Sequence, residues 1–196
     1  MNFDQAGNAI RMSVERVSAQ SSARALLSLE AARDYLRVDH EAEDTAIAGM
    51  VAAARDRVES DSGRILLPET LDVRLDAFPA DGVIWLPVAP VRSVVSVSVL
   101  DAAFAASAVS ASVYVADLVG GQPRILPAPN GAGWPTVGAT ARGVVVRVEA
   151  GYAGASSVPA GLVEALKLAT AAHYARGAAM PIAYYELIRL WGVPWQ

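Results

Sequence analysis

The chain contains no cysteine, which excludes disulfides, thiolate zinc sites and cysteine nucleophiles. It is almost without lysine: Lys167 stands alone among 16 basic residues, and all the others are arginine. Charged residues amount to only 18% of the 196 residues, and the formal net charge is −4. Because non-specific affinity for nucleic acid comes mainly from Lys and Arg contacts with phosphates, an acidic chain is a poor candidate for gripping DNA.

Long apolar segments are missing as well. The N-terminal stretch MNFDQAGNAIRMSVERVSAQ lacks the apolar core of a signal peptide, and uncharged runs such as Ala102–Ala116 are rich in serine and alanine. No stretch resembles a transmembrane span, so we expect a soluble protein made in the cytoplasm, with no membrane partner. Hydrophobic residues reach 54%, mostly as alanine and valine. Such small side chains bury little area each, so packing against other copies or partners is expected to add stability.

The N-terminal part combines a polar start with two helical patterns. Residues 1–26 are weakly patterned, which predicts a flexible arm with some helix around Met12–Val17. Ser28 can cap a first helix in SLEAARDYLRV, and Gly63 ends a second helix predicted over Asp44–Ser60. The apolar residues of these two helices recur at helical spacing: Leu29, Ala32, Leu36, Ile47, Val51, Ala54 and Val58.

From residue 67 the period of the pattern changes to two. In TLDVRLDAF, Leu71, Val73 and Leu75 alternate with charged residues, which is typical of a strand with one buried face. VIWLP, SVVSVSVL, SVYVAD and GVVVRVEAGY repeat the alternation, and the long segment LPAPNGAGWPTVGATARG is too irregular for any element. Strands in series without intervening helices predict antiparallel pairing in a β-rich insertion over residues 67–156.

A helical pattern returns in VPAGLVEALKLATAAHYARG, where Pro159 suits the first turn and Gly177 the stop. One stripe of this helix contains Leu162, Leu166, Ala169 and His173. We interpret His173 as a partly buried packing histidine in mid-helix, since it lies on a mostly apolar stripe.

The order of patterns, helices followed by strands and then a helix, predicts that the outer helices pack together. The helical body would comprise residues 27–66 and 157–178, followed by a C-terminal partner-binding tail at residues 179–196. The expected fold class is α+β: a small helical bundle with an inserted antiparallel β-rich region and a C-terminal aromatic tail.

Motifs for nucleotide binding and for a nucleophilic serine are missing. One cluster looks reactive: DHEAED brings His40, Glu43 and Asp44 together, and an alternative function is therefore a metal-assisted hydrolase. The cluster has no second histidine nearby and no glycine of the kind that a calcium loop needs. We interpret it as a joint between helices in which Asp39 and Asp44 are N-caps and the helix dipole favours the acids by about 0.3–1 kcal/mol each.

The C-terminal segment is crowded with aromatic and aliphatic residues. The candidate partner-binding residues are Tyr184, Tyr185, Leu187, Ile188, Leu190, Trp191 and Trp195. Exposed together, they would form an apolar patch of a kind that soluble monomers avoid, so the segment either folds back on its own body or anchors another protein. A third alternative for the chain is a β-sandwich binding module for sugars, built on Trp85 and Trp134.

Three stretches carry a family pattern. They are LSLEAARDYLRVDHEAEDTAIAGMVAAARDRVESDSGRILLPET, IWLPVAPVRSVVSVSVLD and VRVEAGYAGASSVPAGLVEALKLATAAHYARG. In this order they resemble the head–tail connector (adaptor) proteins of long-tailed bacteriophages and of phage-like gene transfer agents. The resemblance runs from about Leu27 to Gly177 and consists of core and turn residues rather than catalytic signatures.

The resemblance implies a structural protein that is no enzyme and holds no cofactor or metal. It implies a ring, usually of twelve copies, that lies beneath the portal in the neck of a virion or phage-like particle, extends the DNA channel and joins head to tail. The implied partners are the portal protein, a tail-side neck, terminator or stopper protein, and other copies of the chain, while DNA passes without specific binding. The segment Tyr184–Trp195 would reach the portal, and the sequence leaves phage and gene transfer agent both open.

Overall fold

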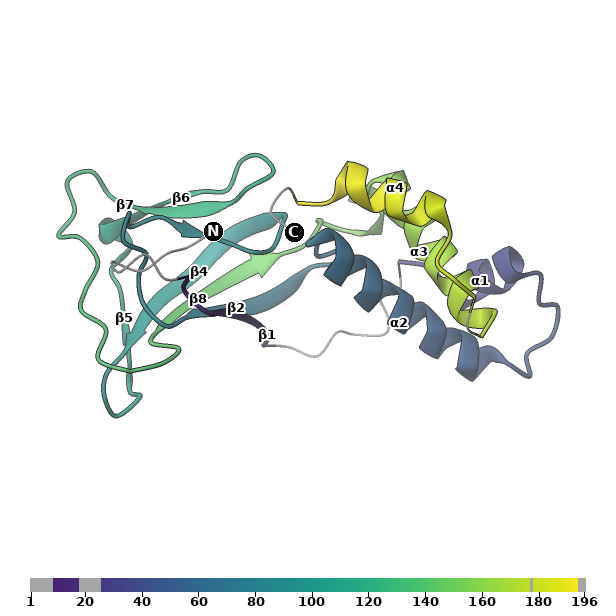
Figure 1. The fold of residues 1–196 in the computed structure, drawn as a ribbon, viewed down its shortest axis with the longest axis horizontal. Coiled ribbons are helices and arrows are strands. Elements are labelled where there is room, and N and C mark those ends of the chain that lie inside the picture. The colour runs from purple at the N-terminus through teal and green to yellow at the C-terminus, as the bar shows by residue number, and fades with distance from the viewer. Residues whose placement is uncertain (1–8, 18–25, 177, 194–196) are drawn as a thin grey trace. The chain divides into compact units, whose positions relative to one another are not determined.

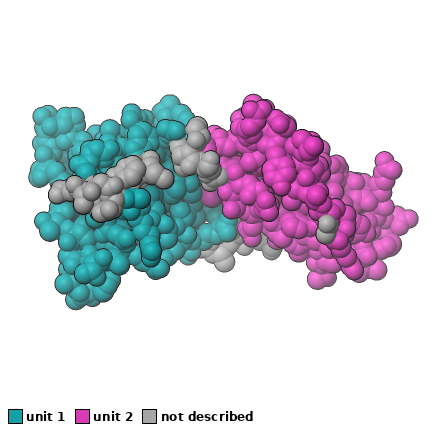
Figure 2. Space-filling model, in the orientation of Figure 1, with its two compact units in different colours: residues 1–20, 68–151, 195 teal, residues 21–67, 152–194, 196 magenta. Residues whose placement is uncertain are grey.

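A computed structural model describes residues 9–17, 26–176 and 178–193 (Figure 1). The chain divides into two compact units, which Figure 2 distinguishes by colour. Unit 1 comprises residues 1–20, 68–151 and 195, and unit 2 comprises residues 21–67, 152–194 and 196. Unit 1 is built from antiparallel strands and unit 2 from helices, so the predicted α+β class is confirmed.

The described part of unit 2 contains four α-helices: α1 (Leu29–Leu36), α2 (Asp44–Ser62), α3 (Ala160–Tyr174) and α4 (Ile182–Trp191). The caps predicted for α1 and α2 are present. The Ser28 hydroxyl accepts a hydrogen bond from the Ala31 N–H at 3.1 Å, and Gly63 ends α2 in the left-handed conformation with φ 65°. Among the described helices, none is both long and apolar enough to cross a membrane.

The core of unit 2 is made mostly of short aliphatic side chains from all four helices. Small residues let the helices approach closely, and one larger side chain, that of Tyr184, completes the core. The fully buried members include Ala32, Ile47, Ala54, Val58, Leu66, Leu162, Ala165, Leu166, Ala169 and Tyr184. The apolar stripes that the sequence predicted for α1, α2 and α3 therefore meet in one core.

Unit 1 contains two antiparallel sheets. The five-stranded sheet has the order β1 (Met12–Arg16), β2 (Glu69–Leu75), β8 (Val144–Ala150), β4 (Val91–Leu100) and β5 (Ala106–Ala108). The three-stranded sheet has the order β3 (Ile84–Trp85), β7 (Arg124–Pro127) and β6 (Tyr114–Asp117). All the pairings are antiparallel, as expected for strands that follow one another without crossover helices.

The period of two in the sequence becomes one buried face of the five-stranded sheet. Leu71, Val73 and Leu75 of β2 are fully buried, and Val73 lies opposite Val146 of β8 in the register. Asp72 departs from the alternation, because it points to the other face and is nevertheless 4% exposed. Its burial is explained below by the arginines around it.

Three local expectations are wrong. Met12–Arg16 is an edge strand rather than helix or loose arm, and it pairs with β2 so that Val14 lies opposite Val73. No side chain of β1 is buried, so the local sequence gives no sign of the strand, and its strand pairing comes from the distant β2. Residues 1–8 and 18–25 of the predicted arm lie outside the described residues.

The second error concerns the irregular segment that starts at Leu126, because β7 runs into it as far as Pro127. The third concerns His173, which is exposed and lies in the last turn of α3 rather than in mid-helix. It continues the line of the buried stripe, but the neighbouring elements no longer cover that stripe at the end of the helix. Helix α3 ends at Tyr174, and the predicted stop, Gly177, lies outside the described residues.

Candidate partner-binding surface

The aromatic segment forms helix α4, which packs against unit 2 through one of its faces. Tyr184 is fully buried, and its hydroxyl donates a hydrogen bond to Asp61 Oδ2 of α2 at 2.8 Å. The same carboxylate oxygen accepts from Arg57 Nε at 2.5 Å. Burial, followed by the bond to Asp61, raises the pKa of Tyr184 well above its usual value, so the phenol stays protonated.

Trp191 holds the other end of α4. Its indole lies so close to Gly161 of α3 that a Cβ atom there would meet Trp191 Nε1 at 2.3 Å. Its carbonyl oxygen accepts from Arg64 Nε at 2.9 Å. Leu187 and Ile188 pack against the same core between these two anchors. Of the predicted partner-binding residues, these four therefore attach the helix to its own unit.

The opposite face of α4 is open to solvent. Ile182 is 81% exposed, Tyr185 51% and Leu190 73%. Tyr185 also makes an edge-on contact with the ring of Tyr184, with centroids 5.4 Å apart. The seventh predicted residue, Trp195, lies outside the described residues. The four inward residues lie at positions i, i+3, i+4 and i+7 of the segment, and this helical spacing is the signal in the sequence that separates them from the outward ones.

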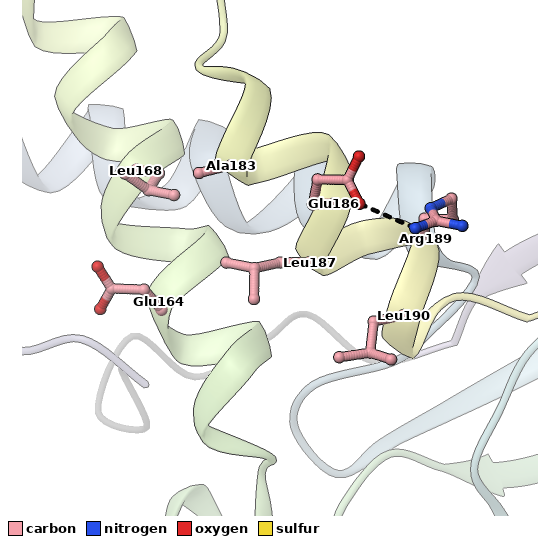
Figure 3. Close-up of a pocket in the computed structure, with 7 residues that line it drawn as sticks. All are labelled: Glu164, Leu168, Ala183, Glu186, Leu187, Arg189 and Leu190. Atoms are coloured by element: carbon pink, nitrogen blue, oxygen red, sulfur yellow. Dashed lines mark hydrogen bonds and ion pairs between the residues drawn. The ribbon is translucent and has the colours of Figure 1, made fainter.

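A shallow groove of about 620 Å³ runs between α3 and α4 (Figure 3). Its apolar lining comes from Leu168 of α3 and from Ala183, Leu187 and Leu190 of α4. Glu164, Glu186 and Arg189 stand around it, and Arg189 Nη2 lies 2.9 Å from Glu186 Oε2. We call this feature the α3–α4 groove.

The acidic cluster between α1 and α2 connects helices rather than capping them. Glu43, not Asp44, occupies the N-cap position of α2, and its side chain makes no capping bond. Glu43 Oε2 instead accepts from the Tyr174 hydroxyl of α3 at 2.6 Å, which raises the pKa of Tyr174. Asp44 Oδ1 accepts from Arg33 Nη1 of α1 at 3.4 Å. The predicted capping role of Asp44 is thus replaced by ties between three helices.

The alternative function as a metal-dependent hydrolase finds no geometric support in this cluster. Across the part of the chain that the structure describes, no three His, Cys, Asp or Glu side chains are grouped so that they could hold a metal ion. His40 is exposed, and Glu43 and Asp44 are occupied by Tyr174 and Arg33.

The tryptophans of the sugar-binding alternative are engaged within unit 1. Trp134 stacks on Phe78 with ring centroids 4.5 Å apart, and its Nε1 donates to the Gly82 carbonyl at 2.8 Å. The guanidinium of Arg124 lies 5.2 Å from the centre of the Trp85 ring. The contacts of Trp134 join loops to one another, and the contact of Trp85 joins β3 to β7. Both rings therefore already have partners within unit 1.

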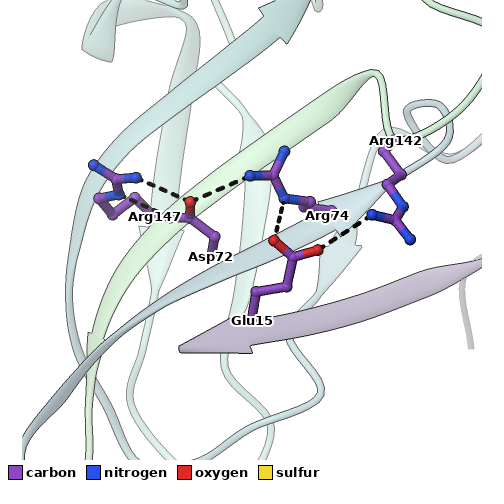
Figure 4. Close-up of polar contacts among 5 residues, drawn as sticks. All are labelled: Glu15, Asp72, Arg74, Arg142 and Arg147. Atoms are coloured by element: carbon purple, nitrogen blue, oxygen red, sulfur yellow. Dashed lines mark hydrogen bonds and ion pairs between the residues drawn. The ribbon is translucent and has the colours of Figure 1, made fainter. Parts of the chain in front are cut away.

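A network of charges on the five-stranded sheet was not expected from the sequence (Figure 4). Arg147 of β8 donates two hydrogen bonds to the buried carboxylate of Asp72 on β2, at 2.7 and 2.9 Å. The hydrogen bond to Asp72 raises the pKa of the Arg147 guanidinium. Arg74 links Asp72, at 3.7 Å, to Glu15 of β1, at 2.9 Å, and Arg142 reaches Glu15 at 3.4 Å. The alternating charges in TLDVRLDAF and VVVRVEA predict which face of each strand is polar. Only the strand register, in which Asp72 lies opposite Arg147, brings the ion-pair partners together.

No protein-family model and no curated protein matches the chain. Solved structures do. A chain from the neck of an empty gene transfer agent (GTA) particle, computed with C6 symmetry, and a chain from the virion of a native GTA particle are each 28% identical, with a TM-score of 0.78. A chain from the neck of a native GTA particle, computed with C12 symmetry, is 26% identical with a TM-score of 0.76. Each match covers 92% of this chain and 95% of the other.

Because these matches span both units, the fold as a whole is that of a structural neck protein of phage-like particles. Within that class, the chain is similar to the neck proteins of gene transfer agents. The resemblance to the head–tail connector family, expected from the sequence, is therefore confirmed.

Proposed function

We propose that the chain is a non-enzymatic head–tail connector that assembles as a ring beneath the portal in the neck of a phage-like particle, extends the DNA channel and joins head to tail. The observation that carries this proposal is the match to GTA neck structures over 92% of the chain at a TM-score of 0.78. A shared module would match one unit alone, whereas this match includes both. The role of a neck component therefore transfers to the whole chain.

The symmetries of the matched structures support a particular copy number. One neck was computed with C6 symmetry and another with C12 symmetry. A ring of twelve identical copies satisfies both symmetries, because a twelvefold axis contains a sixfold one, whereas a ring of six satisfies only the first. We propose twelve copies joined by a repeated heterologous contact.

The partners in this proposal are the portal protein on the head side and a neck, terminator or stopper protein on the tail side. DNA passes through the ring without specific binding. The net charge of −4 suits that role, because a conduit that bound phosphates tightly would retard the passing DNA. The chain would be made in the bacterial cytoplasm and act in the particle neck.

We assign the portal contact to the exposed side of α4. Its exposed apolar residues are Ile182, Tyr185 and Leu190. Leu190 lines the α3–α4 groove, which leaves Tyr185 and the neighbouring Ile182 as the apolar outward groups away from the groove. A tyrosine presented on a helix that is anchored at both ends loses little conformational freedom on binding, which favours it as an interface anchor.

Electron microscopy of particles made with and without this protein tests the proposed function. We expect DNA-filled heads without tails when the protein is missing, and restoration of tails when it is supplied in trans. Normal tailed particles in its absence would contradict the proposal.

The substitution Tyr185→Asp tests the assigned surface more sharply than a truncation, which would also remove Tyr184 and Trp191 from the core. We expect at least a tenfold loss of association with portal-containing heads, measured at a temperature where the variant stays folded, since losing the ring contact with Tyr184 costs only about 0.5–1.5 kcal/mol. Val119→Asp, on a side chain that is 90% exposed in unit 1, is the matched control and should attach normally. Equal attachment of the two variants would show that this side of α4 does not face the portal.

A further inference from the structure

Phe104 is an exposed aromatic side chain at the turn between β4 and β5. It is 60% exposed, and its φ of 62° places it in the left-handed region, where a bulky side chain is uncommon. Glycine or asparagine would satisfy this turn with less strain and without exposing a ring to water. The chain therefore keeps a residue here that its own fold does not favour, which points to a use outside the fold.

The backbone around Phe104 is held rigidly. Asp101 Oδ1 accepts hydrogen bonds from the N–H groups of Ala103 and Ala105, at 2.8 and 2.9 Å, and the Asp101 carbonyl accepts from the Phe104 N–H at 2.9 Å. The backbone of Gly138 packs closely against the turn, since a Cβ at this position would lie 3.0 Å from the Ala102 nitrogen. We call Asp101–Ala105 the tip loop. Because it is preorganised, burying its ring against a partner would order little else.

The α3–α4 groove has the complementary properties. Its floor is apolar, and Leu190 at its edge is 73% exposed. The charges around it are paired with one another, Glu186 with Arg189 at 2.9 Å and Lys167 with Glu164 at 3.5 Å. The tip loop matches this neutral rim, because Ala102–Ala116 carries no charge and the carboxylate of Asp101 is engaged by its own turn. No unpaired charge would be buried if the two met.

A ring of identical copies with heterologous contacts needs two different, complementary patches on every copy. We propose that the tip loop of one copy inserts Phe104 into the α3–α4 groove of the next copy, against Leu190. This inference rests on the proposed ring. It leaves the portal side of α4 free, since Tyr185 and Leu190 are five residues apart and lie about 140° apart around the helix.

Disulfide trapping in assembled particles tests the contact, and the cysteine-free chain makes the readout clean. The double variant Ala103→Cys/Ala183→Cys keeps Phe104 and Leu190 and places one thiol beside the ring and one in the lining of the groove. Mildly oxidised, it should give a ladder of multimers on a non-reducing gel, and either cysteine alone should give no ladder. The matched control Ala103→Cys/Val119→Cys places the second thiol on an exposed position of unit 1 and should give none either.

Intact particles that contain the double variant but show no ladder, or an equal ladder in the Val119 control, would overturn this contact and leave the connector function standing. Failure of the wild-type chain to enter particles would instead overturn the connector function itself.

The substitution Phe104→Gly supplies a second measurement that a folding defect cannot imitate. Because it relieves the backbone strain and removes an exposed ring, the isolated chain should melt roughly 2–4 °C higher. Its incorporation into particles should nevertheless fall at least tenfold. Val119→Gly removes an exposed side chain elsewhere in unit 1 and should incorporate normally. Wild-type incorporation of Phe104→Gly would overturn the proposal.

Discussion

Tyr184 shows how a single side chain determines where the C-terminal helix lies. Its ring fills the core of unit 2, and its hydroxyl meets Asp61 on α2, while the adjacent Tyr185 is half exposed. The phenol is bonded to a carboxylate and screened from water, and both effects favour its neutral form. The attachment of α4 should therefore weaken when this phenol ionises.

The substitution Tyr184→Phe should lower the free energy of unfolding by about 1 kcal/mol near neutral pH, because a buried hydrogen bond to Asp61 is lost. The raised pKa of Tyr184 contributes stability that is complete below the pKa of an unfolded tyrosine, about 10, and is lost as the pH rises through the folded value. The gap between wild type and variant should thus narrow above about pH 10. Urea titrations from pH 8 to 11.5 measure it, and a constant gap would contradict the assignment.

Gly161 should be intolerant of a side chain, because a Cβ there would meet Trp191 Nε1 at 2.3 Å. We expect Gly161→Ala to destabilise by about 1–3 kcal/mol and to shift tryptophan fluorescence as the indole is displaced. Gly49→Ala is the control: it lies in the interior of α2 with nothing within 4 Å of its would-be Cβ. That variant should gain about 0.5–1 kcal/mol, and a similar effect of both changes would refute the close contact.

At the scale of elements, the five-stranded sheet is held together on its two faces by different forces. One face buries valine and leucine side chains of β2 and β8, and the other carries the ion pairs that run from β8 through β2 to β1. The central carboxylate belongs to Asp72, which is 4% exposed, so its charge depends on its arginine partners for compensation. Edge strand β1 has no buried side chain and relies on main-chain bonds and on Glu15 and Arg16.

The substitution Arg147→Met should lower stability by about 2 kcal/mol, because it leaves the buried Asp72 with only the longer contact to Arg74. Arg189→Met is the matched control, since its pair with Glu186 is exposed at both ends, 82% and 62%, and should contribute about 0.5 kcal/mol or less. Chemical denaturation of the two variants gives the comparison. Equal losses would show that the burial of Asp72 does not matter.

At the scale of the whole molecule, the charge balance suits the proposed role as a DNA conduit. The chain carries 20 acidic and 16 basic residues, and many of the described arginines are paired with acids of the same unit, as in the sheet network. Few cations are therefore left to attract a phosphate backbone.

We expect no measurable binding of duplex DNA at micromolar protein and about 0.15 M salt, the ionic strength at which non-specific DNA-binding proteins still bind. Fluorescence anisotropy of a labelled duplex measures this. Tight binding that weakens steeply with salt would contradict the role of a passive channel.

Much of the local structure was predictable because its causes are local. Ser28 and Gly63 end their helices through hydrogen bonds to residues at most four positions away. The alternation in TLDVRLDAF follows from the two faces of one strand. The candidate surface was predicted as a whole segment, although helical spacing divides it. The inward Tyr184, Leu187, Ile188 and Trp191 recur at i, i+3, i+4 and i+7, so periodicity separates Tyr184 from the outward Tyr185.

The sequence by itself determined the α+β class, the order of helices and strands and the resemblance to connector proteins, since these depend on short-range periodicity and turn chemistry. The tertiary structure alone decided that β1 is a strand, that the acidic cluster connects helices, and that the Tyr184 hydroxyl meets Asp61 of α2. Each of these depends on partners far away along the chain: Asp61 lies 123 residues from Tyr184, and Glu43 lies 131 from Tyr174. Such contacts form only when the chain folds back on itself, so a local sequence pattern cannot predict them.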